Sequence, residues 1–326
     1  MNYIAQYNDL LQRGEIPACR RVKAVYARLA EETRTPGQYV FDEAKADRPI
    51  AFIERFCRHS KGEWAGQPVR LELFQKAFLQ ALFGFIAPAT GLRRYREAFF
   101  LVGRKNGKST LLAGLALYML IADGEGGAEV YSTATKYAQA RLLFDECHNM
   151  VKQSPELSKH FRKRKSDLYY IPTMSKLQPL SRNSDSLDGL NASFVIMDEL
   201  HGRKDRNLYE VMRQSQSARR QPLLVMITTA GTVRECIFDD MYNHACEVAD
   251  GIIAATMKAQ PTRLKTIRKA RGFTQQELSD ASGVTLRMIQ LYEQRRNNIN
   301  EASAASVIRL ANALGCQPID MMEPTQ

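Results

Sequence analysis

The stretch Arg96-Glu-Ala-Phe-Phe-Leu-Val-Gly-Arg-Lys-Asn-Gly-Lys-Ser-Thr110 decides the fold of most of this chain. It opens with an apolar run, residues 98–102, which predicts a buried strand. A basic, glycine-containing turn follows, and periodic apolar residues from Ser109 or Thr110 onward predict a helix. Backbone N–H groups and the helix dipole attract phosphate oxygens to such a helix start. The order of strand, turn and helix therefore predicts a nucleotide-binding loop.

The turn departs from the usual phosphate-binding pattern, G-x-x-x-x-G-K-[ST], at its first position. Val102 stands where the first glycine is expected, and Gly103 comes one residue later. Within the pattern, Lys108 reaches the β- and γ-phosphates and the Ser109 hydroxyl ligates Mg²⁺. The alternative at this point is a basic turn in front of an ordinary core helix.

An acidic pair supplies the second half of the predicted site. Asp198-Glu199 follows directly after the apolar run 194–197. A phosphate-loop ATPase needs one carboxylate for the Mg²⁺ shell, here Asp198, and one to orient the attacking water, here Glu199. An isolated Asp-Glu pair also suits a helix N-terminus. In combination with the basic turn, however, the pair predicts ATP binding.

Continuous apolar runs predict the fold class. The runs 98–102, 193–197 and 223–227 do not alternate with polar residues, which is typical of parallel strands covered on both faces. Helices are predicted between these runs, including one over 139–151 whose apolar side holds Leu142, Leu143, Cys147 and Met150. Residues 1–250 are therefore predicted to form an α/β layered domain with a mainly parallel sheet. The last run ends in Thr228-Thr229, which either sense the γ-phosphate or cap the strand end.

The composition favours a polyanionic partner. The 326 residues are 44% hydrophobic and 25% charged, with a net charge of +11, so nucleic acid is the first candidate. Five of the seven residues 159–165 are basic, and this run is either a solvated loop or helix face or a DNA-backbone contact. The six cysteines include no C-x-x-C pair, and the histidines have no metal-ligand spacing. The longest apolar run, 111–122, is too short to span a membrane.

Six motifs together resemble the ATPase domain of the large terminase subunit of tailed bacteriophages, the motor that pumps DNA into the prohead. The resemblance covers about residues 39–251. It is carried by Trp64-Ala-Gly with Leu71-Glu-Leu-Phe-Gln75, Arg104-Lys-Asn-Gly-Lys-Ser-Thr110, Ala134-Thr-Lys-Tyr-Ala-Gln-Ala-Arg141, Met197-Asp-Glu-Leu-His201, Ser215-Gln-Ser-Ala-Arg-Arg-Gln-Pro222 and Ile227-Thr-Thr-Ala-Gly231. It accounts for the displaced glycine, because this family uses a deviant loop containing a basic residue.

The resemblance implies a Mg²⁺-dependent ATPase with ATP and Mg²⁺ as cofactors. It implies that Gln75 reads adenine, that Arg104 reaches the transferring phosphate, and that Thr228 and Thr229 couple hydrolysis to DNA movement. The expected catalytic residues are Glu199, Lys108 and Arg104, the metal ligands are Ser109 and Asp198, and the nucleotide-binding set is Gln75, Arg104, Lys105, Asn106, Gly107, Lys108, Ser109 and Thr110. Double-stranded DNA, a small terminase subunit and a portal are the implied partners, in an oligomer in the cytoplasm of a bacterial host.

The resemblance stops near Gly251, where the family continues into a nuclease domain with a metal-binding carboxylate cluster. The acidic residues beyond Pro261 are spread singly, at Glu277, Asp280, Glu293, Glu301, Asp320 and Glu323. Two-metal cleavage needs carboxylates that converge on ions about 4 Å apart. We therefore expect no nuclease activity.

Residues 251–261 are the expected linker to a small all-α helix-turn-helix bundle, residues 262–326. Thr274-Gln-Gln-Glu277 is a capping box that starts one helix, Gly283 ends it, and a second helix follows over 285–295. The expected core includes Leu264, Ile267 and Ala270 of a helix over 262–271, Ile289 and Tyr292 of the helix over 285–295, and Val307, Leu310, Leu314 and Ile319 near the end.

This tail resembles the Cro/repressor (XRE) family of DNA-binding domains over residues 262–323. The motifs are Arg268-Lys-Ala-Arg-Gly-Phe-Thr-Gln-Gln-Glu-Leu278, Ser282-Gly-Val-Thr285, Ile289-Gln-Leu-Tyr-Glu293 and Leu310-Ala-Asn-Ala-Leu-Gly315. By motif position, the bases are read by Thr285, Leu286, Arg287, Gln290 and Leu291, and Gln275 reaches a phosphate. A helical module that docks protein is the alternative, because fold does not fix function.

Two functions follow from these resemblances. The first is a DNA-packaging motor module that lacks its nuclease and is fused to a sequence-specific DNA reader. The second is a helix-turn-helix transcriptional regulator that carries an inactive ATPase domain. A chain joined from two coding units in a prophage is a further possibility, since Met257 precedes the second domain.

Overall fold

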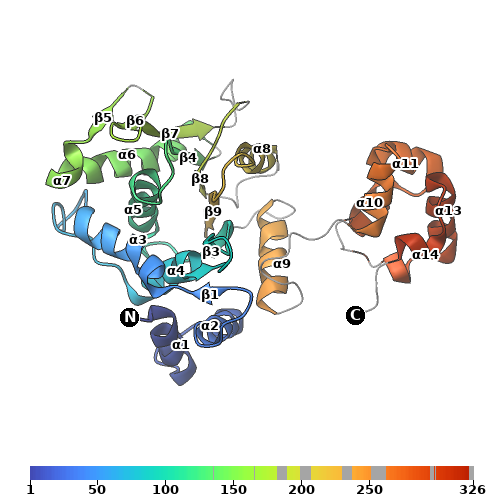
Figure 1. The fold of residues 1–326 in the computed structure, drawn as a ribbon, viewed down its shortest axis with the longest axis horizontal. Coiled ribbons are helices and arrows are strands. Elements are labelled where there is room, and N and C mark those ends of the chain that lie inside the picture. Colours follow the sequence, from blue (N-terminus) through green and yellow to red (C-terminus); the bar gives the residue numbers. More distant parts are fainter. Residues whose placement is uncertain are drawn as a thin grey trace. The chain divides into compact units, whose positions relative to one another are not determined.

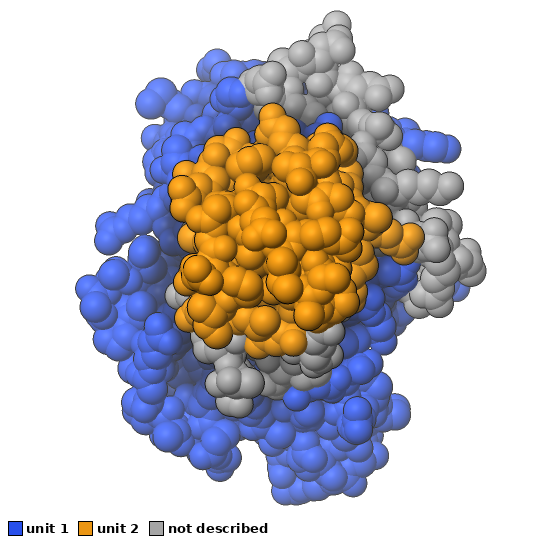
Figure 2. Space-filling view, turned by 90° about the vertical axis from the view of Figure 1, so that its right-hand side faces the viewer, with its two compact units in different colours: residues 1–254 blue, residues 255–326 orange. Residues whose placement is uncertain are grey.

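The computed structural model describes residues 1–134, 136–164, 166–181, 189–198, 207–229, 237–250, 262–293, 297 and 299–322. The chain forms two compact units, residues 1–254 and 255–326 (Figure 2). The expected linker, residues 251–261, lies outside the described residues.

The first unit is built on a mixed sheet that has seven strands within the described residues (Figure 1). Its order is β3-β9-β8-β4-β7-β6-β5, and only the last two strands run antiparallel to their neighbours. The strands are β3 (Glu97–Leu101), β9 (Leu223–Thr228), β8 (Phe194–Asp198), β4 (Glu129–Ala134), β7 (Ser175–Ser181), β6 (Leu168–Tyr170) and β5 (Phe161–Lys163).

Helices cover both faces of the central strands, as their continuous apolar character requires. On one face, α5 (Lys108–Ile121) and α6 (Tyr137–Gln153) pack on Val130, Phe194 and Val225 in the largest apolar core. On the other face, α8 (Asn207–Ser215) and the start of α9 (Ile237–Ala249) pack on Tyr131, Val195 and Met226.

Helix α6 corrects one predicted core residue. Leu143, Cys147 and Met150 are buried as expected, but the Leu142 residue is 67% exposed. The buried residues are spaced by four and three positions and form one stripe, and Leu142 lies a full 100° around the helix from Leu143.

The N-terminal part adds helices against the end of the sheet. They are α1 (Tyr3–Arg13), α2 (Arg20–Glu32), α3 (Glu43–Phe56) and α4 (Leu73–Gly84), with a two-stranded sheet of β1 (Val40–Phe41) and β2 (Phe85–Ile86). Helix α3 starts at Glu43 because the Asp42 side chain caps it, accepting a hydrogen bond from the Lys45 N–H. Pro49 lies inside α3.

The basic run 159–165 is placed differently from the predicted loop or helix face. After the short helix α7 (Pro155–Ser158), residues 161–163 form β5, which pairs with β6 at the edge of the sheet. The strands β5, β6 and β7 were not expected, because β5 and β6 are only three residues long and β7 contains Pro179.

The second unit is a helical bundle. Its helices are α10 (Arg263–Ala270), α11 (Gln275–Ser282), α12 (Leu286–Glu293), α13 (Ala304–Leu314) and α14 (Pro318–Met321), with a 3-10 turn at Ile299–Glu301. The predicted capping box is present, since Thr274 and Glu277 each accept a hydrogen bond from the other residue's backbone N–H. Gly283 ends α11 in the left-handed conformation.

Two predicted core residues of this bundle are wrong. Ile319 is 69% exposed, and Met321, two positions along the same short helix and so on its opposite side, is fully buried instead. Ala270 is exposed at the end of α10, and the inward position is taken by Arg268. The predicted Leu264, Ile289, Tyr292, Val307, Leu310 and Leu314 are buried.

The architecture confirms the predicted fold class, a layered α/β domain with a mainly parallel sheet and a small helical bundle. Among the helices that the structure describes, none is both long enough and apolar enough to cross a membrane.

Candidate functional site

The basic turn joins β3 to α5, as the sequence predicts. Gly107 precedes the first residue of α5 with a φ of 67°, and a Cβ there would lie 2.9 Å from Nε2 of Gln75. Both the backbone conformation and the space therefore favour glycine. Lys105 also has a positive φ, 63°, a strained conformation for a residue with a side chain and one that concentrates at ligand-binding loops.

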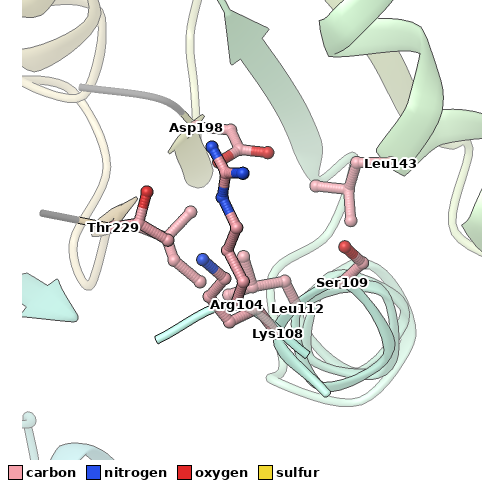
Figure 3. Close-up of a pocket in the computed structure, with 8 residues that line it drawn as sticks. Arg104, Lys108, Ser109, Leu112, Leu143, Asp198 and Thr229 are labelled. Atoms are coloured by element: carbon pink, nitrogen blue, oxygen red, sulfur yellow. The ribbon is translucent and has the colours of Figure 1, made fainter. Parts of the chain in front are cut away.

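A cavity of about 190 Å³ lies at the carboxyl ends of β8 and β9, beside the start of α5 (Figure 3). This edge of a parallel sheet is where ligands bind in open α/β folds. The polar lining comes from the turn and helix start (Arg104, Lys108, Ser109), the end of β8 (Asp198) and the residue after β9 (Thr229). An apolar wall is formed by Leu112, Leu143 and Ile227.

The chemistry of the lining suits a polyphosphate with a divalent cation. Lys108 donates a hydrogen bond from Nζ to the Val102 carbonyl at 3.3 Å, which holds its amine over the turn. Arg104 extends from the turn in the direction of Asp198 (Figure 3). The Ser109 hydroxyl and the Asp198 carboxylate line the same cavity, and oxygens of these kinds are the ligands that Mg²⁺ prefers.

The structure brings together predicted residues that are far apart in sequence. Arg104, Lys108, Ser109, Asp198 and Thr229 all line the cavity. Thr228 is buried next to it, and its hydroxyl donates to the Thr229 carbonyl at 3.0 Å. Glu199 lies outside the described residues.

The remaining loop residues shape the turn rather than line the cavity. Lys105, Asn106 and Gly107 are exposed, and Thr110 is half-buried in the first turn of α5. Asn106 donates hydrogen bonds from Nδ2 to the carbonyls of Gly103 and Arg104, each at 3.2 Å, and so closes the turn.

Gln75 lies beside the turn, outside the cavity lining, and is 6% exposed. Its Oε1 accepts from the Glu72 N–H at 3.0 Å, and its Nε2 donates to the Asn106 carbonyl at 3.2 Å. Both ends of the side-chain amide are thus engaged, and Gln75 links the start of α4 to the turn. The adenine contact expected of Gln75 stays a prediction.

The sequence did not single out the apolar wall. Leu112 and Leu143 belong to the buried stripes of α5 and α6, and Ile227 belongs to β9. Their pattern is that of ordinary core residues, so only the spatial arrangement shows that they border a ligand-sized cavity.

In the second unit, the predicted base-reading residues lie on the outer side of α12 and at its start. Thr285 and Arg287 are exposed, and Leu286, Gln290 and Leu291 are half-buried, whereas Ile289 and Tyr292 face the core. The Thr285 Oγ1 also accepts from the Met288 N–H at 3.4 Å, at the start of the helix.

A buried ion pair holds α12 in place. The Arg268 guanidinium of α10 donates to both carboxylate oxygens of Glu293, at 2.5 and 2.9 Å, and to the Phe273 carbonyl. Gln275, the first residue of α11, donates from Nε2 to the same carboxylate at 2.7 Å. Glu293 therefore ties three helices together, and the Gln275 amide that was predicted to reach a phosphate is engaged inside the protein.

The comparisons with known proteins agree with this arrangement. The model of the family "Terminase large subunit, ATPase domain" matches residues 73–247, and a helix-turn-helix model matches residues 264–320. The large terminase subunit of Enterobacteria phage HK97 is 32% identical over 191 residues, which are 57% of this chain and 36% of that protein. The terminase large subunit of Lactococcus phage p2 is 27% identical over 229 residues, 67% of this chain and 42% of that protein.

The fold comparison gives the same result. The crystal structure of the HK97 bacteriophage large terminase superposes with a TM-score of 0.56 and 24% identity, over 76% of this chain and 54% of that one. By the sequence matches, the chain spans less than half the length of the phage HK97 and phage p2 large subunits. Because the family model matches more than half of its residues, the chain belongs to the family of terminase large subunit ATPase domains, and a helix-turn-helix domain follows in the same chain.

Proposed function

We propose that the first unit is a Mg²⁺-dependent ATPase that works on DNA, as the motor module of a DNA-packaging machine. One observation carries this proposal: a single cavity is lined by Lys108 and Ser109 from the turn and by Asp198 from a different strand. These are the parts that phosphate-loop enzymes use to hold and polarise a triphosphate.

The roles follow from the chemistry of each group. Lys108 binds the β- and γ-phosphates, and Arg104 stabilises the negative charge that shifts during transfer of the γ-phosphoryl group. Ser109 and Asp198 are placed to hold Mg²⁺, which neutralises phosphate charge when it is bound. Glu199, the residue after β8, orients the attacking water in this proposal.

Thr229 contacts the same cavity from the end of β9, and the Thr228 hydroxyl is bonded to its carbonyl. We infer that this pair transmits the loss of the γ-phosphate to β9. A small terminase subunit and a portal, in an oligomer in the host cytoplasm, are the proposed setting for this motor.

The proposal is tested by ATP turnover with and without duplex DNA, for the wild-type chain and Glu199→Gln. Turnover that DNA stimulates and the variant loses would support the motor. If the wild type shows no turnover under either condition, the chain is a DNA-binding protein with an inactive ATPase fold.

Replacing Gln75 by alanine should lower turnover roughly five-fold, because the Asn106 carbonyl loses a hydrogen bond of about 1 kcal/mol that holds the turn. Rates with ATP and GTP should fall together, and steady-state kinetics with both nucleotides measure this. A loss confined to ATP would instead show that Gln75 reads adenine.

For the second unit, we propose sequence-specific DNA reading by α12. Replacing the exposed Arg287 by alanine should cost about 1–3 kcal/mol at one base pair of the selected site. Site selection from a random DNA library, followed by titration of single-base variants, measures the effect. An equal loss on every sequence would assign Arg287 to the phosphate backbone.

A further inference from the structure

The outer face of helix α12 is apolar at both of its margins. Counted at about 100° per residue, four residues follow one another around this face in the order Leu286, Gln290, Arg287 and Leu291. They span about 140° of the helix surface, and the buried residues of α12 occupy the opposite side. A polar pair is therefore flanked by one leucine on each side.

Neither leucine belongs to the core of the second unit. The buried cluster and the partly buried apolar residues packed against it include Ile289 and Met288 of the same helix, but they do not include Leu286 or Leu291. Both leucines are half-buried, so each leaves part of its apolar surface in water. Covering that surface with another apolar group would be favourable.

The polar pair between the leucines has hydrogen-bonding groups to offer. In the described part of the chain, no hydrogen bond or ion pair engages the side chain of Arg287 or Gln290. The Gln275 amide, by contrast, is held by the Glu293 carboxylate. In the major groove, arginine pairs with the O6 and N7 atoms of guanine, and glutamine pairs with the N6 and N7 atoms of adenine.

The major groove also carries one apolar group that a leucine can contact. Each thymine exposes its C5 methyl there, beside the donors and acceptors of the base edges. An apolar side chain at a reading position therefore recognises thymine by contact and not by a hydrogen bond.

The following inference rests on the DNA reading proposed above for α12. We propose that Leu286 and Leu291 read the C5 methyl groups of thymines that flank the base pairs contacted by Arg287 and Gln290. The selected sites then carry thymine on both sides of a central pair of hydrogen-bonded contacts. The two leucines set specificity at the flanks, and the group they recognise is a methyl group.

A simpler explanation is that the leucines are ordinary surface residues, because single exposed apolar side chains are common. That explanation does not account for their position at both margins of one otherwise polar face, outside the core of the bundle. A face that docks protein is the other alternative. Shortening the leucines would then leave the affinity for DNA unchanged.

The test uses the full-length chain and starts from the duplex that the chain selects from a random library. Each thymine of that duplex is replaced in turn by deoxyuridine, which keeps the hydrogen-bonding edge of thymine and lacks only the methyl group. Affinities are measured for the wild type, Leu286→Ala, Leu291→Ala and the control Ile308→Ala. Ile308 lies on α13 and is 50% exposed, so its replacement also shortens an apolar side chain at the surface of the same unit. Circular dichroism establishes that each variant is folded.

Uracil should weaken binding by the wild type about four-fold at each of the flanking thymines, as expected for one methyl group that is no longer buried. Each of these effects should disappear in one leucine variant and persist in Ile308→Ala. At the same positions, a duplex with 5-methylcytosine should bind more tightly than one with cytosine, because only the former restores the methyl group.

Uracil duplexes that bind as tightly as thymine duplexes would overturn this inference and leave sequence-specific reading by α12 intact. Leucine variants that lose the same factor on both kinds of duplex would also overturn it, because the leucines would then support the helix without touching the methyl groups. If the wild-type chain selects no site from the library, the proposed DNA reading itself fails, and this inference fails with it.

Discussion

Replacing Lys108 by alanine should reduce ATP turnover by about 10²–10³-fold. The amine is held over the turn by the Val102 carbonyl and lines the cavity opposite the acidic strand end. In the proposed mechanism it is a preorganised positive charge beside the transferring phosphate, and loss of one such group typically has an effect of this size. Release of inorganic phosphate under saturating DNA and Mg²⁺ measures it.

The matched control is Lys152→Ala, which removes an exposed lysine from the last turn of α6. Its turnover should equal that of the wild type, and the unfolding midpoints of both variants should stay near the wild-type value. If Lys108→Ala retained more than a tenth of the wild-type rate, Lys108 would not be the phosphate-binding residue.

Replacing Glu293 by alanine should destabilise the second unit by about 3–5 kcal/mol, because it leaves the buried Arg268 charge without its partner. The two side chains are only 2% and 8% exposed, and the hydrogen bond to Glu293 raises the pKa of Arg268. A loss of this size is comparable with the whole stability of a small domain. The unit should therefore be largely unfolded at room temperature, while the ATP turnover proposed for the first unit should be unchanged.

Unfolding by urea, followed by circular dichroism and by the fluorescence of the single tryptophan, Trp64, separates the two units, since Trp64 reports on the first. The double replacement Arg268→Met/Glu293→Leu is the informative control, because apolar residues of similar size remove both charges together and often cost little. If Glu293→Ala were as stable as the double variant, the ion pair would not hold the bundle together.

Much of the fold follows from local sequence patterns. The strands β3, β8 and β9 are continuous apolar runs, and the helices of the second unit are bounded by caps and glycines such as Thr274 and Gly283. These signals are local, so they can be recognised without knowing what packs against them. The same holds for the turn at Gly107, where a short motif determines both conformation and chemistry.

Other features depend on partners that are distant in sequence. The strands β5 to β7 hold polar residues at their exposed positions, and their pairing becomes visible only in three dimensions. Ile319 and Ala270 were expected in the core from their residue type, whereas Arg268 is buried because Glu293, 25 positions away, neutralises it. Gln75 is a similar case, since its amide is oriented by Glu72 and by the turn.

The most direct test of the central claim is a calorimetric titration of ATP into the full chain, with Mg²⁺ and with EDTA, for the wild type and Asp198→Asn. We predict one nucleotide per wild-type chain, with binding strengthened by Mg²⁺, and a loss of that Mg²⁺ effect in the variant. Absence of binding at millimolar ATP, or an identical Mg²⁺ dependence in both proteins, would contradict the claim that one cavity holds the triphosphate and its metal.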